Sequence, residues 1–217
     1  APNILITCWH CVRERPASGR AYAAMRRRAL EYEPLVLEDI EQDKGGKDLA
    51  LAKINAHPEN PMLLPENQYI RGTEVLSFGY PLTEKLSVND GGNFKFNLVP
   101  RYFQGYMTRV FQHRTRNYGE ILSYEVNFSA PEGLSGAPLI LVQPHMAVVG
   151  VIYGNFDSYT LLEEVSIDPK TGKSSAEVRR VISFGLACHT DVLRNLRGQV
   201  TDNLPLFEHL KKINYAF

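Results

Sequence analysis

The sequence predicts an all-β fold, a barrel or a sandwich, and three observations favour it. Short apolar, β-prone runs recur along most of the chain, turn residues separate these runs, and helical patterns are few. No internal repeat or low-complexity segment indicates a solenoid or a propeller. The 217 residues are 44% hydrophobic and 22% charged, so the chain is long and apolar enough to bury a sizeable core.

The expected elements follow from local composition. Residues 19–33 interleave alanines with arginines before Pro34, and this segment is predicted to be a helix. A hairpin turn is predicted at 168–173. Strands are predicted at 4–8, 35–40, 48–54, 74–78, 102–111, 120–128, 138–142, 147–153 and 181–187. Two further short helices are predicted at 191–197 and 204–213.

Charge and cysteine content narrow the class of protein. Lys plus Arg number 24 and Asp plus Glu number 24, so the basic excess typical of nucleic-acid binding is absent. The apolar runs are too short to cross a bilayer, and no signal-peptide pattern is present, so neither nucleic acid nor a membrane is an expected partner. Three cysteines do not make a disulfide framework, which predicts a reducing, cytoplasmic location.

Three segments carry the residues of a nucleophilic hydrolase. His10 follows an apolar strand, Asp48 precedes an alternating apolar run, and Ser135 lies between glycines ahead of an apolar strand. A serine hydroxyl needs a neighbouring base, histidine suits that role near neutral pH, and a carboxylate orients the imidazole. Flanking glycines let backbone N–H groups approach a developing oxyanion. The chain order His, Asp, Ser is that of chymotrypsin-like proteases.

These segments resemble the motifs of trypsin-like serine proteases, in the cysteine-poor bacterial and HtrA-like branch. Thr7-Cys8-Trp9-His10-Cys11 is similar to Thr-Ala-Ala-His-Cys, and Asp48-Leu49-Ala50-Leu51 is similar to Asp-Ile-Ala-Leu. Gly133-Leu134-Ser135-Gly136-Ala137-Pro138-Leu139 is similar to Gly-Asp-Ser-Gly-Gly-Pro-Leu. Gly79-Tyr80-Pro81 and residues 148–154 are weaker matches. The resemblance runs from about residue 4 to about residue 196.

The resemblance implies a fold and a domain arrangement. The fold is two antiparallel six-stranded β-barrels of the chymotrypsin type with a few short helices. The first barrel is expected over about residues 1–70, the second over about 71–200, and a C-terminal helix or tail over 201–217. Only nine residues precede His10, so we expect the first barrel to lack its N-terminal strands and the chain to be a fragment of a longer polypeptide.

The resemblance also implies roles for particular residues. It makes the chain a serine endopeptidase that needs no metal or other cofactor and forms an acyl-enzyme with a protein or peptide substrate. Ser135 is the implied nucleophile, His10 the general base and then acid, and Asp48 the group that orients His10. The implied oxyanion donors are the N–H groups of Gly133 and Ser135. The implied substrate-binding residues are Ser129, Tyr153, Gly154 and Asn155.

The sequence departs from the family pattern at four positions. Trp9 replaces a small residue beside the histidine, and Ala137 replaces a glycine. Leu134 replaces the acid that pairs with a freed N-terminus in zymogen-activated members. Ser129 replaces the acid that gives trypsin its basic preference, and Asp157 is a possible alternative source of pocket charge. The P1 preference and the activation route therefore do not carry over.

Several alternatives remain open at this point. One alternative is a zinc site built from Cys8, His10, Cys11 and Cys188-His189. It is disfavoured because a regular strand would point Cys8 and Cys11 to opposite faces. Buried, unpaired thiols are therefore the preferred interpretation of the cysteines. An α/β-hydrolase that uses Ser135, Asp157 or Asp168, and His189 is disfavoured because no βαβ alternation precedes the serine. The functional alternatives are an inactive protease-like peptide-binding module and a protease regulated by further domains or subunits of a sensor or defence assembly.

Overall fold

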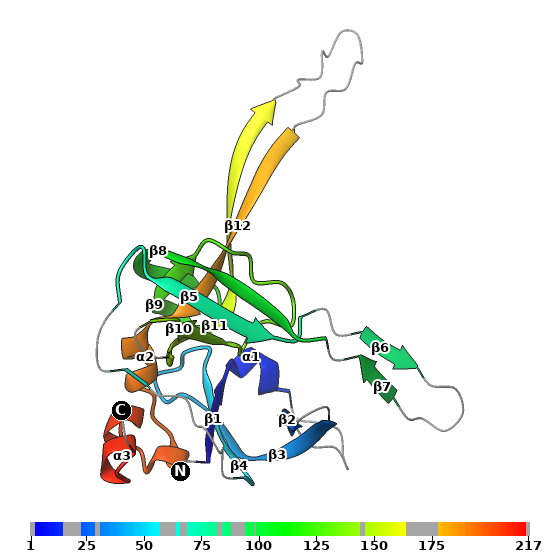
Figure 1. Ribbon diagram of the computed structural model, residues 1–217. Helices are drawn as coiled ribbons and strands as arrows, with labels where there is room; N and C mark the ends of the chain where they lie inside the picture. Colours follow the sequence, from blue (N-terminus) through cyan, green and yellow to red (C-terminus); the bar gives the residue numbers. More distant parts are fainter. Residues whose placement is uncertain are drawn as a thin grey trace.

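The chain is mostly β-structure with a few short helices. The computed structural model describes residues 3–14, 23–28, 31–56, 64–65, 69–81, 84–87, 94–97, 99–143, 146–163 and 178–215. These residues form an open four-stranded sheet, a closed six-stranded barrel and a separate two-stranded ribbon (Figure 1). All strand pairs within them are antiparallel.

The open sheet comes from the N-terminal part of the chain. Its strands are β1 (Ile4–Thr7), β2 (Ala23–Arg28), β3 (Glu31–Gln42) and β4 (Ala50–Ile54), in the order β1-β4-β3-β2. The strands predicted at 4–8, 35–40 and 48–54 correspond to β1, β3 and β4. Over the described residues β1 and β2 are edge strands, so this half is an open sheet, as expected for a first barrel that lacks part of its six strands.

The helix predicted at residues 19–33 is wrong. Residues 23–28 form β2, and the strand β3 begins at Glu31. The register pairs Ala23 with Val36 and Arg28 with Glu31, as in a hairpin. Backbone pairing with β3 therefore outweighs the helix propensity of alanine and arginine, which is a preference of less than about 1 kcal/mol per residue.

The closed barrel contains the strands that the sequence predicts most clearly. These are β5 (Glu74–Gly79), β8 (Arg101–Thr115), β9 (Gly119–Val126), β10 (Pro138–Leu141), β11 (Ala147–Glu163) and β12 (Val178–Cys188), in the cyclic order β10-β11-β12-β9-β8-β5. Alternate side chains point inward and fill the barrel, among them the fully buried Val75, Tyr124, Leu139 and Ile152. Closure pairs β5 with β10, and beyond Val151 the strand β11 pairs with β12 alone.

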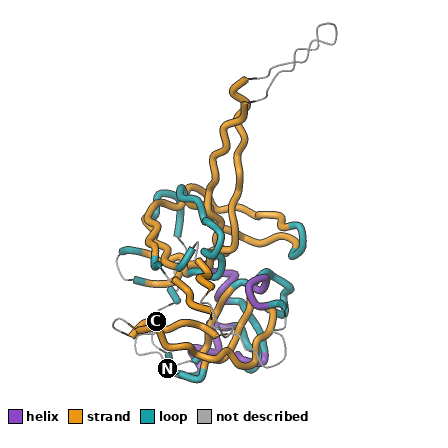
Figure 2. The backbone as a smooth tube through the Cα atoms, turned by 90° about the vertical axis from the view of Figure 1, so that its right-hand side faces the viewer, coloured by secondary structure: helices purple, strands orange, loops and turns teal. Residues whose placement is uncertain are grey.

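Two pairs of strands project from the barrel region. β11 and β12 run well past the barrel as a long two-stranded arm, which Figures 1 and 2 show from two directions. A second ribbon, β6 (Glu84–Ser87) with β7 (Phe94–Asn97), extends to another side (Figure 1). The turn predicted at 168–173 lies outside the described residues.

The C-terminal segment packs back against the N-terminal sheet. It contains α2 (Thr190–Arg194), the 3-10 turn η1 (Gln199–Thr201) and α3 (Leu206–Lys212), which match the two helices predicted there. Leu193, Leu206 and Leu210 share one core cluster with Leu49 and Leu51 of the N-terminal half. Within the described residues no helix combines the length and apolar character needed to span a membrane.

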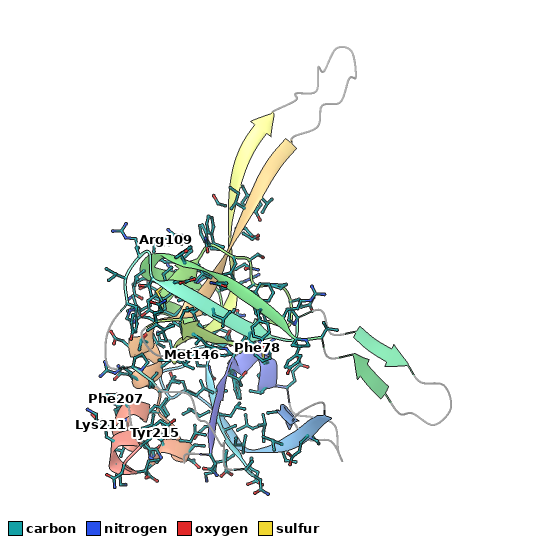
Figure 3. All side chains as sticks on the ribbon, viewed as in Figure 1. Phe78, Arg109, Met146, Phe207, Lys211 and Tyr215 are labelled. Carbon is teal, nitrogen blue, oxygen red and sulfur yellow. The ribbon has the colours of Figure 1, made fainter. Side chains whose placement is uncertain are left out.

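Surface contacts reinforce this packing. Figure 3 shows Phe207, Lys211 and Tyr215 together at the C-terminal end, where the Lys211 Nζ atom lies 4.4 Å from the centre of the Phe207 ring. The Val200 N–H donates to the Glu41 Oε1 atom at 2.8 Å. The Lys44 N–H donates to the carbonyl of Arg197 at 3.1 Å. The last two contacts hold β3 and the segment that follows it, which leads to Asp48, against the C-terminal segment.

Candidate active site

A single helical turn, α1 (Trp9–Val12), presents His10 where the open sheet meets the barrel (Figure 1). The turn begins immediately after β1, with Cys8 as its extended N-cap residue. The loop before β4 holds it in place, because the Trp9 N–H donates to the carbonyl of Asp48 at 3.2 Å. The His10 N–H also donates to the Asp48 Oδ1 atom at 2.9 Å.

His10 and Asp48 are joined through their side chains as well. The His10 Nδ1 atom lies 2.6 Å from the Asp48 Oδ2 atom. Asp48 is only 7% exposed, whereas a third of the His10 side chain (33%) remains accessible. The hydrogen bond to Asp48, and after it one to Cys11, raises the pKa of His10 to about 10 against the opposing effect of burial. This is the arrangement in which a carboxylate fixes the imidazole tautomer and stabilises the imidazolium.

Ser135 lies in a compact loop built on two glycines with positive φ. The Leu134 N–H donates to the carbonyl of Pro131 at 3.0 Å, and Gly133 has φ +87°, which identifies a type II turn. Gly136, on the other side of Ser135, has φ +88°. Within the described residues the backbone N–H groups of Gly133 and Ser135 donate no hydrogen bond.

Leu134 explains how the loop is anchored without the acid of the family pattern. Leu134 is 0% exposed and belongs to the same barrel-core cluster as Val75 and Tyr124. A Cβ atom at Gly79 would lie 2.9 Å from Leu134 Cδ1, so Gly79 gives the leucine its space. Hydrophobic burial of Leu134 therefore anchors the loop to the barrel core.

The Ser135 loop packs directly against the His10 turn. The carbonyl of Ile152 accepts hydrogen bonds from the Gly136 N–H at 2.8 Å and from the Cys8 thiol at 3.1 Å. The Cys11 Sγ atom lies 3.7 Å from the carbonyl oxygen of Ser135. The structure therefore brings His10 and Asp48 into contact and sets the backbone of Ser135 beside them. Among the described residues no hydrogen bond joins the Ser135 hydroxyl to the His10 ring.

The predicted substrate-binding residues lie on β11 and the adjacent loop. Ser129 is exposed, and Gly154 borders open space, since a Cβ atom there would meet nothing within 4 Å. The Asn155 side chain accepts from the Ala130 N–H at 2.7 Å and donates to its carbonyl at 2.8 Å, which ties β11 to the loop beside Ser129. The Asn155 side chain thus holds the backbone of the loop at Ala130.

Tyr153 is directed inward. Its hydroxyl group lies 2.7 Å from the Ser123 Oγ atom and 3.0 Å from the His113 Nδ1 atom, and burial raises its pKa. It occupies an irregularity in the β11–β12 register, between Ile152 and Gly154. The phenol group of Tyr153 is therefore engaged within the fold by Ser123 and His113.

Sequence reasoning missed the relationship between Cys8 and Cys11. A regular strand would have separated the two side chains, but β1 ends at Thr7, and from the helical turn that follows both sulfur atoms contact backbone carbonyls beside the Ser135 loop. Cys8 is fully buried, Cys11 is exposed and Cys188 is buried, so the expectation of three buried thiols is wrong for Cys11. The C-x-x-C spacing was the signal that could have found this pair.

Metal-ligating atoms also gather here. Atoms of Cys8, His10 and Asp48 lie within 4.8 Å of one another. His10 and Asp48 are already hydrogen-bonded to each other at 2.6 Å. The described residues supply fewer than the four converging ligands of a closed zinc site.

The structure rules out the α/β-hydrolase alternative. Ser135 belongs to an antiparallel barrel, whereas that fold requires parallel strands with helical crossovers, and the described residues contain none. Asp157 lies on the arm formed by β11 and β12, where it accepts a hydrogen bond from Ser183 at 2.5 Å. His189 is buried and accepts from the Asp191 N–H at 3.1 Å as the cap of α2.

Comparison with known proteins agrees with this architecture. Residues 1–151 match the family described as the trypsin-like peptidase domain. No curated protein matches the chain in sequence.

Solved structures are similar in fold. The apo MamO protease domain from Magnetospirillum magneticum has a TM-score of 0.56 at 17% identity, over 88% of this chain and 80% of that one. The active form of the Rv3671c protease from M. tuberculosis has a TM-score of 0.55 at 16% identity, over 100% of this chain and 72% of that one. The inactive form of the Rv3671c protease has a TM-score of 0.51 at 17% identity, over 98% of this chain and 80% of that one. At these identities the similarity establishes the fold alone.

Proposed function

Because the chain belongs to the family of trypsin-like peptidase domains, we propose that it is a serine endopeptidase in which His10, Asp48 and Ser135 are the catalytic residues. The observation that carries the proposal is the 2.6 Å contact between the His10 Nδ1 atom and the buried Asp48 carboxylate, beside the Ser135 loop. The general base and its orienting group are thus in direct contact, and the family motif supplies the nucleophile.

The proposed reaction is hydrolysis of a peptide bond through an acyl-enzyme. Ser135 Oγ attacks the carbonyl carbon while His10 Nε2 takes its proton, and His10 then gives that proton to the leaving amine. Water attacks the acyl group in a second, equivalent step. The Gly133 and Ser135 N–H groups, which are free of other partners among the described residues, support the proposal that they bind the tetrahedral oxyanion.

We propose that the substrate is an extended protein or peptide segment. Open space beside Gly154 and the inward side chain of Tyr153 leave the backbone of β11 accessible for an added strand. Ser129 and Asn155 would then define the neighbouring pocket, Asn155 by holding the loop that ends at Ala130. A reducing, cytoplasmic location and regulation by further domains or subunits remain part of this proposal.

The proposal is tested by replacing the nucleophile. Ser135→Ala should abolish hydrolysis of an unfolded protein substrate and labelling by a fluorophosphonate probe, while thermal unfolding stays unchanged. Ser158→Ala, a half-buried serine of the β11 arm, is the matched control and should retain both activities. Both assays should run from pH 7 to about pH 10, because His10 loses its proton over this range. If the unmodified chain binds peptides but neither hydrolyses them nor reacts with the probe, the enzyme proposal is wrong and the peptide-binding alternative is correct.

A further inference from the structure

Two cysteines flank the proposed catalytic histidine on one helical turn. Cys8 precedes α1 as its N-cap residue, Cys11 lies three residues on, and the Cys11 N–H donates to the carbonyl of Cys8 at 3.2 Å. The Cys8 Sγ atom lies 3.1 Å from the carbonyl oxygen of Ile152, to which the Gly136 N–H also donates, and the Cys11 Sγ atom lies 3.7 Å from the carbonyl oxygen of the adjacent Ser135, so both sulfur atoms lie at one junction. Residues three apart on a helical turn are neighbours, so a Cys8–Cys11 disulfide requires only a local adjustment.

The two thiols differ in access to solvent. Cys11 is exposed at the surface beside the Ser135 loop, whereas Cys8 is fully buried and its Sγ atom lies 3.1 Å from the carbonyl of Ile152. An accessible cysteine next to a protected one is the arrangement of an attacking thiol and a resolving thiol. Cys188 belongs to the same core cluster as Cys8, is fully buried, and accepts a hydrogen bond from the Val151 N–H at 3.2 Å.

We propose that Cys8 and Cys11 form a redox-active dithiol that exchanges with small soluble disulfides of the glutathione class, with Cys11 attacking and Cys8 resolving. The Cys11 thiolate attacks one sulfur of the glutathione disulfide, which forms a mixed disulfide and releases one glutathione thiolate. Cys8 then gives its proton to that thiolate and attacks the Cys11 sulfur. The Cys8–Cys11 bond forms, the second glutathione leaves as a thiolate, and two electrons have passed from the cysteines to the oxidant.

The ionisation of the three cysteines supports this division of roles. The hydrogen bond with Cys8, followed by the hydrogen bond and charge of His10, lowers the pKa of Cys11 to about 5. The same contact with Cys11, together with burial, raises the pKa of Cys8 above its usual range. Burial raises the pKa of Cys188 to about 12. Near neutral pH, Cys11 is therefore the cysteine expected to be a thiolate. Cys188 is expected to stay protonated, so its reactivity serves as the reference against which that of Cys11 is compared.

The exchange would act on the proposed active site, since both half-cystines adjoin His10. Oxidation withdraws the Cys8 thiol from the carbonyl of Ile152 and removes the Cys11 charge that faces the imidazole, whose other ionic neighbour is Asp48. This effect on hydrolysis rests on the proposed function. The dithiol chemistry itself does not, because it needs neither Ser135 nor a peptide substrate.

The experiment equilibrates the chain with mixtures of reduced and oxidised glutathione, traps free thiols with iodoacetamide and identifies them by mass spectrometry after trypsin digestion. Residues 1–13 contain no internal Lys or Arg, so one tryptic peptide carries Cys8 and Cys11, and a second carries Cys188. With more oxidant, the first peptide should lose the mass of two hydrogen atoms and resist alkylation, while Cys188 stays reduced. In the reduced chain, Cys11 should alkylate at least about tenfold faster than Cys188.

Three variants make the test specific. Cys8→Ser should trap Cys11 as a lasting glutathione adduct, Cys11→Ser should leave Cys8 unreacted, and Cys188→Ala should behave as the unmodified chain does. Running the series on Ser135→Ala as well separates this proposal from the proposed function, because the exchange should be unaffected there. Three results would each overturn the proposal. The thiols could stay free at every glutathione ratio, or Cys11 could keep a glutathione adduct that Cys8 never resolves. The thiols could also react only after a chelator is added.

Discussion

The buried thiol of Cys8 lies 3.1 Å from the carbonyl oxygen of Ile152, 144 residues further along the chain. The same carbonyl accepts the Gly136 N–H at 2.8 Å, so one peptide group of β11 connects the His10 turn to the Ser135 loop. The Cys11 Sγ atom also approaches the Ser135 carbonyl. The candidate site is therefore held together by backbone groups that have no sequence motif of their own.

Asp48→Asn should remove the charge that holds the His10 ring. The amide can still accept from the His10 N–H, so the turn should remain folded, but the imidazole loses its orienting carboxylate. We expect hydrolysis to fall on the order of 10³- to 10⁴-fold in kcat, as in related triads. The measurement is kcat on a peptide substrate together with the circular dichroism spectrum. A loss of less than tenfold with an intact fold would contradict a catalytic role for Asp48.

Gly136→Ala should disrupt the loop that carries Ser135. The position has φ +88°, and a Cβ atom would collide with Thr7 Oγ1. Gly46 is a matched control, because it has φ +70° but open space around it, so Gly46→Ala introduces the backbone strain alone. We expect Gly136→Ala to lose activity and to be less stable than Gly46→Ala in urea unfolding. Equal stability of the two variants would show that the contact with Thr7 is unimportant.

The pH dependence of the chain should reflect the raised pKa of His10. A histidine whose folded-state pKa lies near 10 binds its proton more tightly in the folded state, so this contribution to stability is full below pH 6.5 and is lost as the pH rises through about 10. Hydrolysis requires neutral His10 and should instead increase over the same range. Urea unfolding and kcat/KM, measured from pH 6 to about 10, should therefore move in opposite directions.

Cys11→Ser should shift that activity profile to lower pH, because the contact with Cys11 is the second contribution that raises the pKa of His10. Cys188→Ala is the control, since Cys188 has no contact with His10 among the described interactions. NMR titration of the His10 ring, compared between the two variants, checks the assignment directly. An unchanged midpoint in Cys11→Ser would mean that Asp48 alone sets the ionisation of His10.

Leu134→Ala should destabilise the chain through the core. The side chain is fully buried in the barrel cluster, and a leucine-to-alanine change at such a site costs about 2–5 kcal/mol. Val181→Ala, at a side chain that is 51% exposed, should change the free energy of unfolding by no more than about 0.5 kcal/mol. Urea unfolding measures both. If Leu134→Ala were equally mild, burial of this leucine would not be what anchors the Ser135 loop.

The sequence by itself determined the fold class, the strands of the barrel and the identity of the His10, Asp48 and Ser135 motifs, because apolar alternation and short motifs are local properties of a chain. It also predicted helices at 191–197 and 204–213, where α2 and α3 lie. Only the tertiary structure decided that residues 23–28 pair as a strand, since cross-strand contacts outweigh local helix propensity.

Tertiary structure likewise decided that Cys8 and Cys11 both lie beside the Ser135 loop and that Leu134 is an anchor. Each of these depends on where a strand ends or on which distant residues surround a side chain. The carbonyl of Ile152 is the clearest case, because any residue type could supply it and only the folded chain puts it between Cys8 and Gly136.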